Sequence, residues 1–307
     1  PGSGEYLPVK ARSRKQGMTL SHTFPPRGSL LLVVRPPEAP EGLVAGPPKP
    51  PGRKHVLKGR WRIRRLDPNV LVLDTARWRT DDEPYSDPMP VVDIQQELMR
   101  RDRQQPVTLK FEFACGVSDL SGRRFQLVVE DPSSHELWYN EMRTPLNDAG
   151  PYWDAAFRRT DVTRYIRDGA NVVELRRPWQ MDPRQRALLT GRAGGWAVRT
   201  AAPDTELEAV YLVGDFAVDF PEGTRQGDGG SRWMLGRPTL VDEPDRLTGT
   251  DLVRAGYPFF TGRLVLEREV TLAHAPREGA VLELPSFKAV TATVVVNGHE
   301  AGTVWQC

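Results

Sequence analysis

Hydrophobic and polar residues alternate along many short stretches of this chain, and one series of stretches occurs twice. The first copy comprises 124–130, 136–140, 157–163 and 169–175, and the second comprises 280–284 and 292–298. In the first copy 35 residues separate Asn140 from Leu175 (175 − 140), whereas 10 remain after Asn297 (307 − 297). Alternation of hydrophobic and polar residues with a period of two is typical of a half-buried β-strand. The repeat therefore predicts two β-sandwiches, the second truncated and with an exposed apolar edge near 294–296.

The same alternation predicts the remaining elements. Further strands are expected at 61–66, 69–78, 108–113, 205–218 and 262–272. One helix is expected at 92–101, where Ile94 and Leu98 share a face at i, i+4 spacing. Asn297-Gly298, between valine-rich strands, predicts a type I′ hairpin turn, which needs positive φ at both positions.

The abundance of turn-forming residues supports the same fold class. The chain has 28 prolines and 27 glycines among 307 residues. We therefore predict an all-β protein with two jelly-roll-like β-sandwich domains rather than a parallel α/β sheet. The expected order is a tail of a preceding domain (1–35, with strands at 18–24 and 29–34), a proline-rich linker (36–56), the first sandwich (57–220), a connecting loop (221–255) and the incomplete second sandwich (256–307).

Charge, hydropathy and cysteine usage narrow the function classes. The net charge is only +2, from 42 basic and 40 acidic side chains, which argues against nucleic acid as a partner. No apolar run reaches the ~18 residues of a membrane helix. The cysteines are Cys115, expected as a buried thiol, and Cys307, and neither they nor the histidines show metal-binding spacing.

Several stretches, in order, resemble a known family. They are 69–74, 152–163, 169–175, 206–216 and 256–262. Together they resemble the accessory β-sandwich (galactose-binding-like, or family 2 sugar-binding-like) region of bacterial α-L-rhamnosidase-like glycoside hydrolases, over 57–307. Two stretches depart from that pattern, namely 138–141, where an Asn-Gly hairpin is usual, and an Arg/Gly-rich insert at 184–199.

The resemblance implies an accessory part of a larger enzyme. The catalytic barrel would lie upstream in the same polypeptide and hydrolyse O-glycosidic bonds, α-L-rhamnosides among them. Glycoside hydrolysis needs two carboxylates roughly 5–10 Å apart. Glu208 and Asp215 would lie roughly 23 Å apart if one strand ran through both. We therefore predict no catalytic residues in this chain.

The segment around Trp153 is the predicted binding site. Sugars present apolar C–H faces and hydroxyl rims, which aromatic and polar side chains respectively contact. The candidates for carbohydrate binding are Tyr152, Trp153, Asp154 and Arg158. The alternative is that Trp153 packs in the core and Arg158 pairs with Asp154. The aromatic segment 257–260 could form a second rim or a wedge between domains.

Three function hypotheses follow from these observations. The first is a non-catalytic, carbohydrate-binding accessory fragment of a glycoside hydrolase, with carbohydrate and the upstream catalytic domain as partners. The second is a stand-alone carbohydrate-binding or adhesion module, and the third is a purely structural domain. No cofactor or metal ligand set is predicted, although a structural Ca²⁺ near 242–245 stays open. Localisation is not indicated, because a fragment does not reveal secretion.

Overall fold

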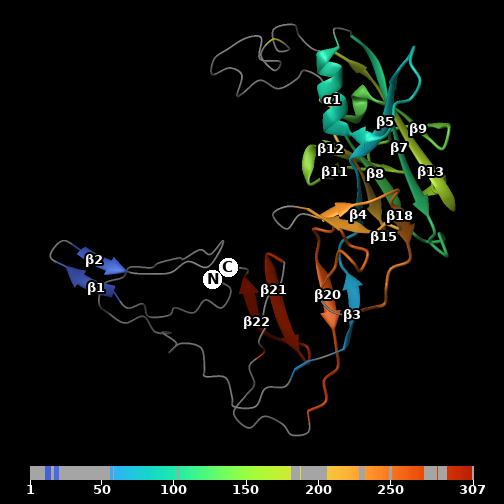
Figure 1. Ribbon diagram of the computed structural model, residues 1–307. Helices are drawn as coiled ribbons and strands as arrows, with labels where there is room; N and C mark the ends of the chain where they lie inside the picture. Colours follow the sequence, from blue (N-terminus) through green and yellow to red (C-terminus); the bar gives the residue numbers. More distant parts are fainter. Residues whose placement is uncertain are drawn as a thin grey trace. The chain divides into compact units, whose positions relative to one another are not determined.

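The computed structural model describes residues 11–14, 17–20, 56–57, 59–101, 104–180, 187, 206–227, 232–248, 251–272, 282 and 289–305 (Figure 1). They belong to two compact units, one spanning Gly59–Glu269 and the other Pro1–Lys58 with Val270–Cys307. Strands predominate, so the all-β, sandwich-like prediction is confirmed. Outside the described residues, wholly or nearly so, lie the expected linker 36–56, the strands at 29–34 and 280–284, the insert 184–199 and Cys307.

The unit Gly59–Glu269 contains the sandwich, and we call it the sandwich unit. Its elements, in chain order, are β3 (Arg60–Arg65), β4 (Asn69–Leu73), β5 (Thr75–Thr80), β6 (Met89–Pro90), α1 (Val91–Arg100), β7 (Gln105–Cys115), β8 (Phe125–Glu130), the 3-10 turn η1 (Pro132–Ser134), β9 (Glu136–Tyr139), β10 (Met142–Thr144), β11 (Pro151–Tyr152), β12 (Asp154–Asp161), η2 (Thr163–Tyr165), β13 (Gly169–Trp179), β14 (Val210–Gly214), β15 (Ala217–Asp219), β16 (Thr224–Gln226), β17 (Arg232–Met234), β18 (Thr239–Val241), β19 (Arg246–Thr248) and β20 (Leu264–Glu267).

Two sheets form the sandwich. The larger has the order β10-β9-β13-β7-β18-β15, with β5 also pairing with β7 and β6 with β5. The smaller has the order β11-β12-β8-β14-β4. Side chains of both sheets, such as Phe111, Phe113, Leu127 and Leu212, belong to one buried cluster. The core therefore lies between the sheets, as in other β-sandwiches.

Alternation in the sequence explains why each strand has a buried face. In β7, Leu109, Phe111 and Phe113 are buried, while Lys110 and Glu112 between them are partly exposed. In β8, Phe125, Leu127 and Val129 belong to the same core cluster. Successive side chains of a strand point to opposite faces, so each apolar set covers one side of the core.

The predicted helix is present as α1. Val91, Ile94 and Leu98 are its buried residues, and the last two have the spacing that predicted them. Asp93 in the first turn and Arg100 in the last complement the helix dipole. The helix ends where Arg101 adopts an extended conformation, with its guanidinium stacked 4.5 Å from the ring centroid of Trp78.

The turn joining β9 and β10 follows the expected hairpin geometry with an unusual residue. Asn140 and Glu141 have φ of 48° and 69°, the left-handed pair of a type I′ turn. The second position usually holds glycine, because a Cβ is disfavoured there. The hairpin geometry is therefore kept where the sequence departs from the Asn-Gly pattern.

The sandwich unit extends past the expected boundary at residue 220. β18, within the expected connecting loop, pairs in parallel with β7, and Ala114 N donates to Pro238 O at 2.8 Å. β20, within the segment assigned to the second sandwich, pairs with β3, on whose other side lies β19. These long-range pairs join 239–267 to the sandwich unit, whereas the sequence pattern alone placed a boundary at residue 220.

The other unit is described through two hairpins. β1 (Ala11–Arg14) pairs with β2 (Gly17–Leu20), and β21 (Thr291–Val296) pairs with β22 (His299–Trp305). Asn297 and Gly298 join the latter pair with φ of 51° and 83°, which confirms the predicted turn. Val295 and Val296 are 59% and 54% exposed, in agreement with an apolar edge at this place.

Candidate functional site

The hairpin between β11 and β12 presents the predicted aromatic pair. Tyr152 pairs with Asp154 across the tip, which leaves Trp153 as the turn residue. Trp153 has φ 57° and is 80% exposed, the largest exposed fraction among the described large hydrophobic residues. Its ring lies edge-to-face with Tyr152, with centroids 6.2 Å apart. A bulky residue in the left-handed region is strained, and such strain is concentrated at functional sites.

The two polar candidates have partners within the chain. The Asp154 carboxylate accepts a hydrogen bond from Ala156 N at 2.8 Å, which closes the turn. Arg158 pairs with Asp148 rather than with Asp154, and its Nε donates to Asp148 Oδ1 at 3.0 Å. The Arg158 hydrogen bond is the main cause that lowers the pKa of Asp148. The structure thus brings Tyr152 and Trp153 together and directs Arg158 to another loop.

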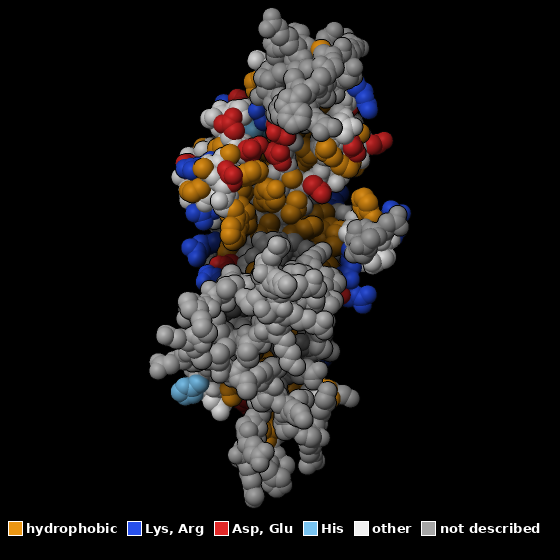
Figure 2. Space-filling model, turned by 90° about the vertical axis from the view of Figure 1, so that its left-hand side faces the viewer, with side chains coloured by type: hydrophobic (Ala, Val, Ile, Leu, Met, Phe, Trp, Pro, Cys, Tyr) orange, Lys and Arg blue, Asp and Glu red, His pale blue; other side chains and the backbone are white. Residues whose placement is uncertain are grey.

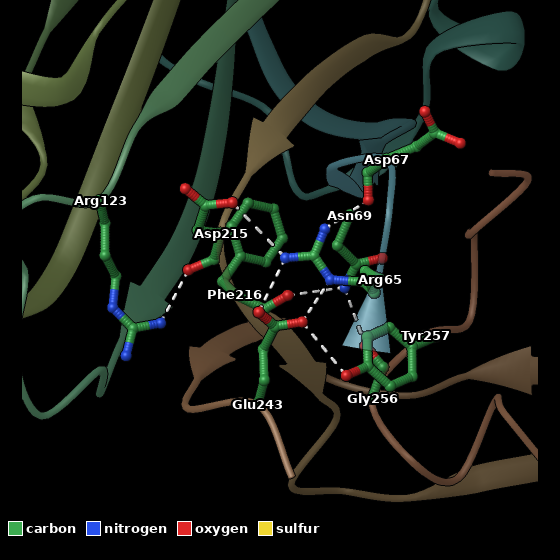
Figure 3. A network of polar contacts seen from close by, with 9 residues as sticks. All are labelled: Arg65, Asp67, Asn69, Arg123, Asp215, Phe216, Glu243, Gly256 and Tyr257. Atoms are coloured by element: carbon green, nitrogen blue, oxygen red, sulfur yellow. Dashed lines mark hydrogen bonds and ion pairs between the residues drawn. The ribbon is translucent and has the colours of Figure 1, made fainter. Parts of the chain in front are cut away.

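A polar network around Arg65 ties distant segments of the unit together (Figure 3). The Arg65 side chain is 8% exposed and pairs with both oxygens of Glu243, with Nη2 2.7 Å from Oε2. Arg65 Nη1 also donates to Asp67 O at 2.6 Å, and Nη2 lies 3.6 Å from Asp215. Tyr257 donates its hydroxyl to Glu243 Oε1 at 3.1 Å. We call this group the Arg65 clamp.

Buried Asn69 extends the clamp. Asn69 is fully buried, and its Nδ2 donates to Phe216 O at 2.9 Å and to Gly256 O at 3.0 Å. Gly256 has φ 96°, and a Cβ there would lie 2.5 Å from the Ala217 Cβ. Because Arg65 contacts the carboxylates of both Asp215 and Glu243, the Arg65 clamp holds together the segments that carry these residues.

The segment 257–260 is part of this internal packing. Tyr257 is buried and contacts Phe260, with ring centroids 6.0 Å apart. Phe259 packs against the main core cluster and lies 6.2 Å from Phe220, centroid to centroid. This aromatic segment therefore packs within the sandwich unit.

A small cavity brings together ionisable groups that sequence reasoning did not connect. Glu130, His135, Arg177 and Glu208 line it with apolar neighbours, and its volume is ≈ 10 Å³. Burial is the main cause that raises the pKa of Glu130, followed by the charge of Glu208. The volume is about that of one water molecule, so a sugar ring does not fit between these carboxylates. Glu130 lies in β8 and Arg177 in β13, whereas His135 and Glu208 precede β9 and β14, so only the pairing of these distant strands brings the four residues together.

We expect His135 to make the fold less stable in mild acid. Burial, and secondarily the charge of Arg177, lower the pKa of His135 from 6.5 to about 4. The folded protein therefore holds the neutral form, and stability present above the unfolded pKa is lost as the pH falls from 6.5 toward 4. At pH 5 this amounts to about 2 kcal/mol.

Urea unfolding at neutral pH and at about pH 5 would measure this loss. The free energy of unfolding of the wild type should fall by about 2 kcal/mol more than that of His135→Gln. An equal pH dependence in both proteins would contradict a partly buried His135 that stays neutral in the folded state.

The described residues offer no metal centre. No group of three or more His, Cys, Asp or Glu side chains among them could hold a metal ion. In the stretch considered for Ca²⁺, Asp242 pairs with Arg123 and accepts a hydrogen bond from Ser118 N at 3.1 Å. In the part of the chain described, no helix has the length and apolar character needed to cross a membrane. Cys115 is a buried free thiol, as the alternation of β7 predicts.

Comparison with known proteins gives partial similarities. No protein-family model and no curated protein matches the sequence. The β-D-glucuronidase of Dictyoglomus thermophilum is 16% identical over 54% of this chain and 32% of its own, with a TM-score of 0.31. The β-glucuronidase of Bifidobacterium dentium is 15% identical over 54% of this chain and 34% of its own, with a TM-score of 0.30. A rhamnosidase from Novosphingobium sp. PP1Y is 15% identical over 53% of this chain and 16% of its own, with a TM-score of 0.26. The chain thus spans about a third or less of the length of these enzymes.

Proposed function

We propose that this chain is a non-catalytic, carbohydrate-binding accessory part of a glycoside hydrolase. The single observation that carries the proposal is the exposed, left-handed Trp153 beside Tyr152. Placing a large apolar ring in water, on a strained backbone, is unfavourable for folding alone. A flat indole beside a tyrosine is, however, suited to stacking against the C–H face of a sugar.

Two pairs of neighbouring carboxylates among the described residues support a non-catalytic role. A glycosidase needs one carboxyl group to protonate the leaving oxygen and a second on the other side of the sugar. Asp215 and Glu243 share the guanidinium of Arg65. Glu130 and Glu208 face a cavity too small for a sugar ring. Hydrolysis is therefore assigned to the rest of a parent polypeptide, and the sequence resemblance favours O-glycosides such as α-L-rhamnosides as its substrates.

The polar candidates would act at the rim of the platform. Asp154 follows Trp153 directly and is exposed, so its carboxylate can accept a hydrogen bond from a sugar hydroxyl. Arg158 would contribute by holding Asp148 and the adjoining loop, with which it forms the ion pair. Stacking is thus assigned to Tyr152 and Trp153, and orientation of the sugar to Asp154.

Replacing Trp153 separates binding from stability. We expect Trp153→Ala to weaken glycan affinity about tenfold or more, because the stacking surface is removed. We expect Trp153→Gly to lose binding equally while unfolding with a free energy equal to the wild type or up to about 1 kcal/mol higher, because glycine accepts positive φ.

Calorimetric titration of the 307-residue chain with neutral and rhamnose-containing oligosaccharides would measure affinity, and urea unfolding would measure stability. Trp233→Ala is the matched control, because Trp233 is 58% exposed on the separate β16–β17 hairpin. Unchanged affinity in Trp153→Ala, with binding in the wild type, would rule out the proposed platform.

A further inference from the structure

The two outer faces of the sandwich differ in chemistry. The outer face of the larger sheet carries paired charges, with Arg77 3.3 Å from Glu112 and Arg176 2.7 Å from Asp81. Tyr85 on the same side donates its hydroxyl to Glu174 at 2.8 Å. Charged side chains interspersed in this way are typical of a water-exposed sheet face. The larger sheet therefore has the outer face expected of a protein surface.

The outer face of the smaller sheet is instead apolar. Strand alternation places Val128, Tyr211 and Val213 on the side away from the core. They form a separate cluster, which we call the aromatic face; its members are Val70, Val72, Val128, Tyr152, Phe157, Tyr211, Val213 and Phe259. Figure 2 shows a patch of hydrophobic side chains beside acidic ones on this side of the described residues.

Four of the five partly buried members of this face carry aromatic rings. Val70, Val128 and Val213 are buried beneath their neighbours, whereas Val72 and the aromatic members are only partly buried. Phe157 lies edge-to-face with Tyr211, with centroids 5.7 Å apart. Because Tyr152 contacts Trp153, the face continues directly into the proposed platform. A contiguous apolar face that is partly exposed in this way is typical of a binding site.

Negative charge accompanies the aromatic face. After burial, the charge of Glu208 is the main cause that raises the pKa of Tyr211, and Glu130 and Asp74 act in the same direction. Burial, and secondarily the charge of Glu206, raise the pKa of Glu208. Carboxylates that repel one another are stabilised by an added cation.

One cation also belongs to this side of the sheet. Arg159 lies opposite Val128 in the register of β12 with β8. Its Nη2 donates to Ala149 O at 3.3 Å, so the guanidinium is held toward that loop. Arg177, which lines the small cavity with Glu130 and Glu208, is a second cation near these carboxylates. Among these described residues the four carboxylates Glu130, Glu206, Glu208 and Asp74 exceed the two arginines, so the face combines ring side chains with a net negative rim.

We propose that the aromatic face binds a glycan chain that carries positive charge, namely a chain of amino sugars with protonated amines. The inference rests on the proposed carbohydrate-binding function and specifies its ligand. One sugar would stack on Trp153, and the following sugars would lie over Tyr152 and Tyr211. The cavity that Glu130 and Glu208 line is too small for a sugar ring, but its volume is about that of one water molecule, so an ammonium group would enter it and form charge-assisted hydrogen bonds with these carboxylates.

Titrations of the full 307-residue protein with glycans of different length and charge test this inference. Calorimetric titrations would use the dimer and the hexamer of glucosamine, the N-acetylglucosamine hexamer and an oligogalacturonate. We expect the glucosamine hexamer to bind about tenfold more tightly than the dimer and than the neutral hexamer, and the anionic oligomer to bind least. Higher salt should weaken the binding of the glucosamine hexamer but not that of the neutral one.

Two variants test which residues cause the gain in affinity with glycan length and the preference for the charged glycan. Tyr211→Ala should remove the gain from chain length, and Tyr85→Ala on the opposite sheet is its control. Glu208→Gln, which keeps the side-chain shape, should remove the preference for the glucosamine hexamer over the neutral hexamer while keeping the gain from length. Glu208→Gln therefore tests the charge even if Tyr211→Ala does not fold.

The outcomes separate this inference from the proposed function. If short glycans bind in a Trp153-dependent manner but the hexamer binds no more tightly than the dimer, the aromatic face is not a glycan site and the platform stands. If both hexamers bind equally and Glu208→Gln changes nothing, the charge selection is wrong. If no glycan binds, the proposed function fails as well. A self-associating chain that Tyr211→Ala converts to a monomer would make the face a protein interface and overturn the inference.

Discussion

Replacing Arg65 with alanine is expected to lower the free energy of unfolding by about 3 kcal/mol. The Arg65 side chain is 8% exposed, and its removal would leave Glu243 without its bidentate partner. The usual cost of breaking a buried ion pair is about 3–5 kcal/mol, and the lower end applies because Glu243 is 29% exposed. Asp67 O would also lose its hydrogen bond from Arg65.

The double replacement Arg65→Met with Glu243→Leu tests whether Arg65 and Glu243 stabilise the fold as an ion pair or independently of each other. Both charges are removed together, so the double variant should be more stable than Arg65→Ala, although two residues have changed. Arg64→Ala is the control, because Arg64 is exposed on the same strand. Urea unfolding measures the free energy of unfolding of the wild type and of each of these variants. A loss below about 0.5 kcal/mol in Arg65→Ala would show that the Arg65 clamp does not hold the unit together.

Asn171→Ala is expected to cost a comparable amount, about 3 kcal/mol. Asn171 is 1% exposed, and its Nδ2 donates to Arg167 O at 2.7 Å and to Gly169 O at 3.1 Å. Its Oδ1 accepts hydrogen bonds from Arg167 N and Asn140 Nδ2, each at 3.1 Å. Alanine would leave several buried groups without partners, and each carries a desolvation cost.

The matched control is Asn147→Ala, at an exposed position of a neighbouring loop. It should change the free energy of unfolding by no more than about 0.5 kcal/mol. Asn171→Asp keeps the acceptor, loses both donors and places a charge beside two carbonyl oxygens, so it should also destabilise the fold. Wild-type stability in Asn171→Ala would mean that these hydrogen bonds are not formed in solution.

Local pattern was sufficient for the elements whose partners are close in sequence. The i, i+4 pair Ile94 and Leu98 predicted α1, and Asn297-Gly298 predicted the turn before β22. Strict alternation predicted β7. In each case the physical signal, helix periodicity or turn conformation, lies within a few residues.

Features that depend on long-range contacts were not predictable. β18 has three residues and joins β7 only through parallel pairing with a strand more than a hundred residues earlier. Arg65 and Glu243 are 178 positions apart, and neither lies in a motif. For the candidate site, the aromatic residues Tyr152 and Trp153 could be chosen from the sequence because their residue types suit a sugar. The exposure of Trp153 could not be predicted, because it depends on a left-handed backbone conformation that the residue type does not reveal.

Affinity electrophoresis of the full chain, combined with an assay for released reducing sugar, tests most directly whether this protein binds carbohydrate without cleaving it. Soluble polysaccharide in the gel, including a glucosamine polymer and a rhamnose-containing one, should retard the wild type and Trp233→Ala but not Trp153→Ala, and no reducing sugar should be released. Equal migration of the wild type with and without every polysaccharide, or release of sugar by the chain itself, would contradict a non-catalytic carbohydrate-binding role.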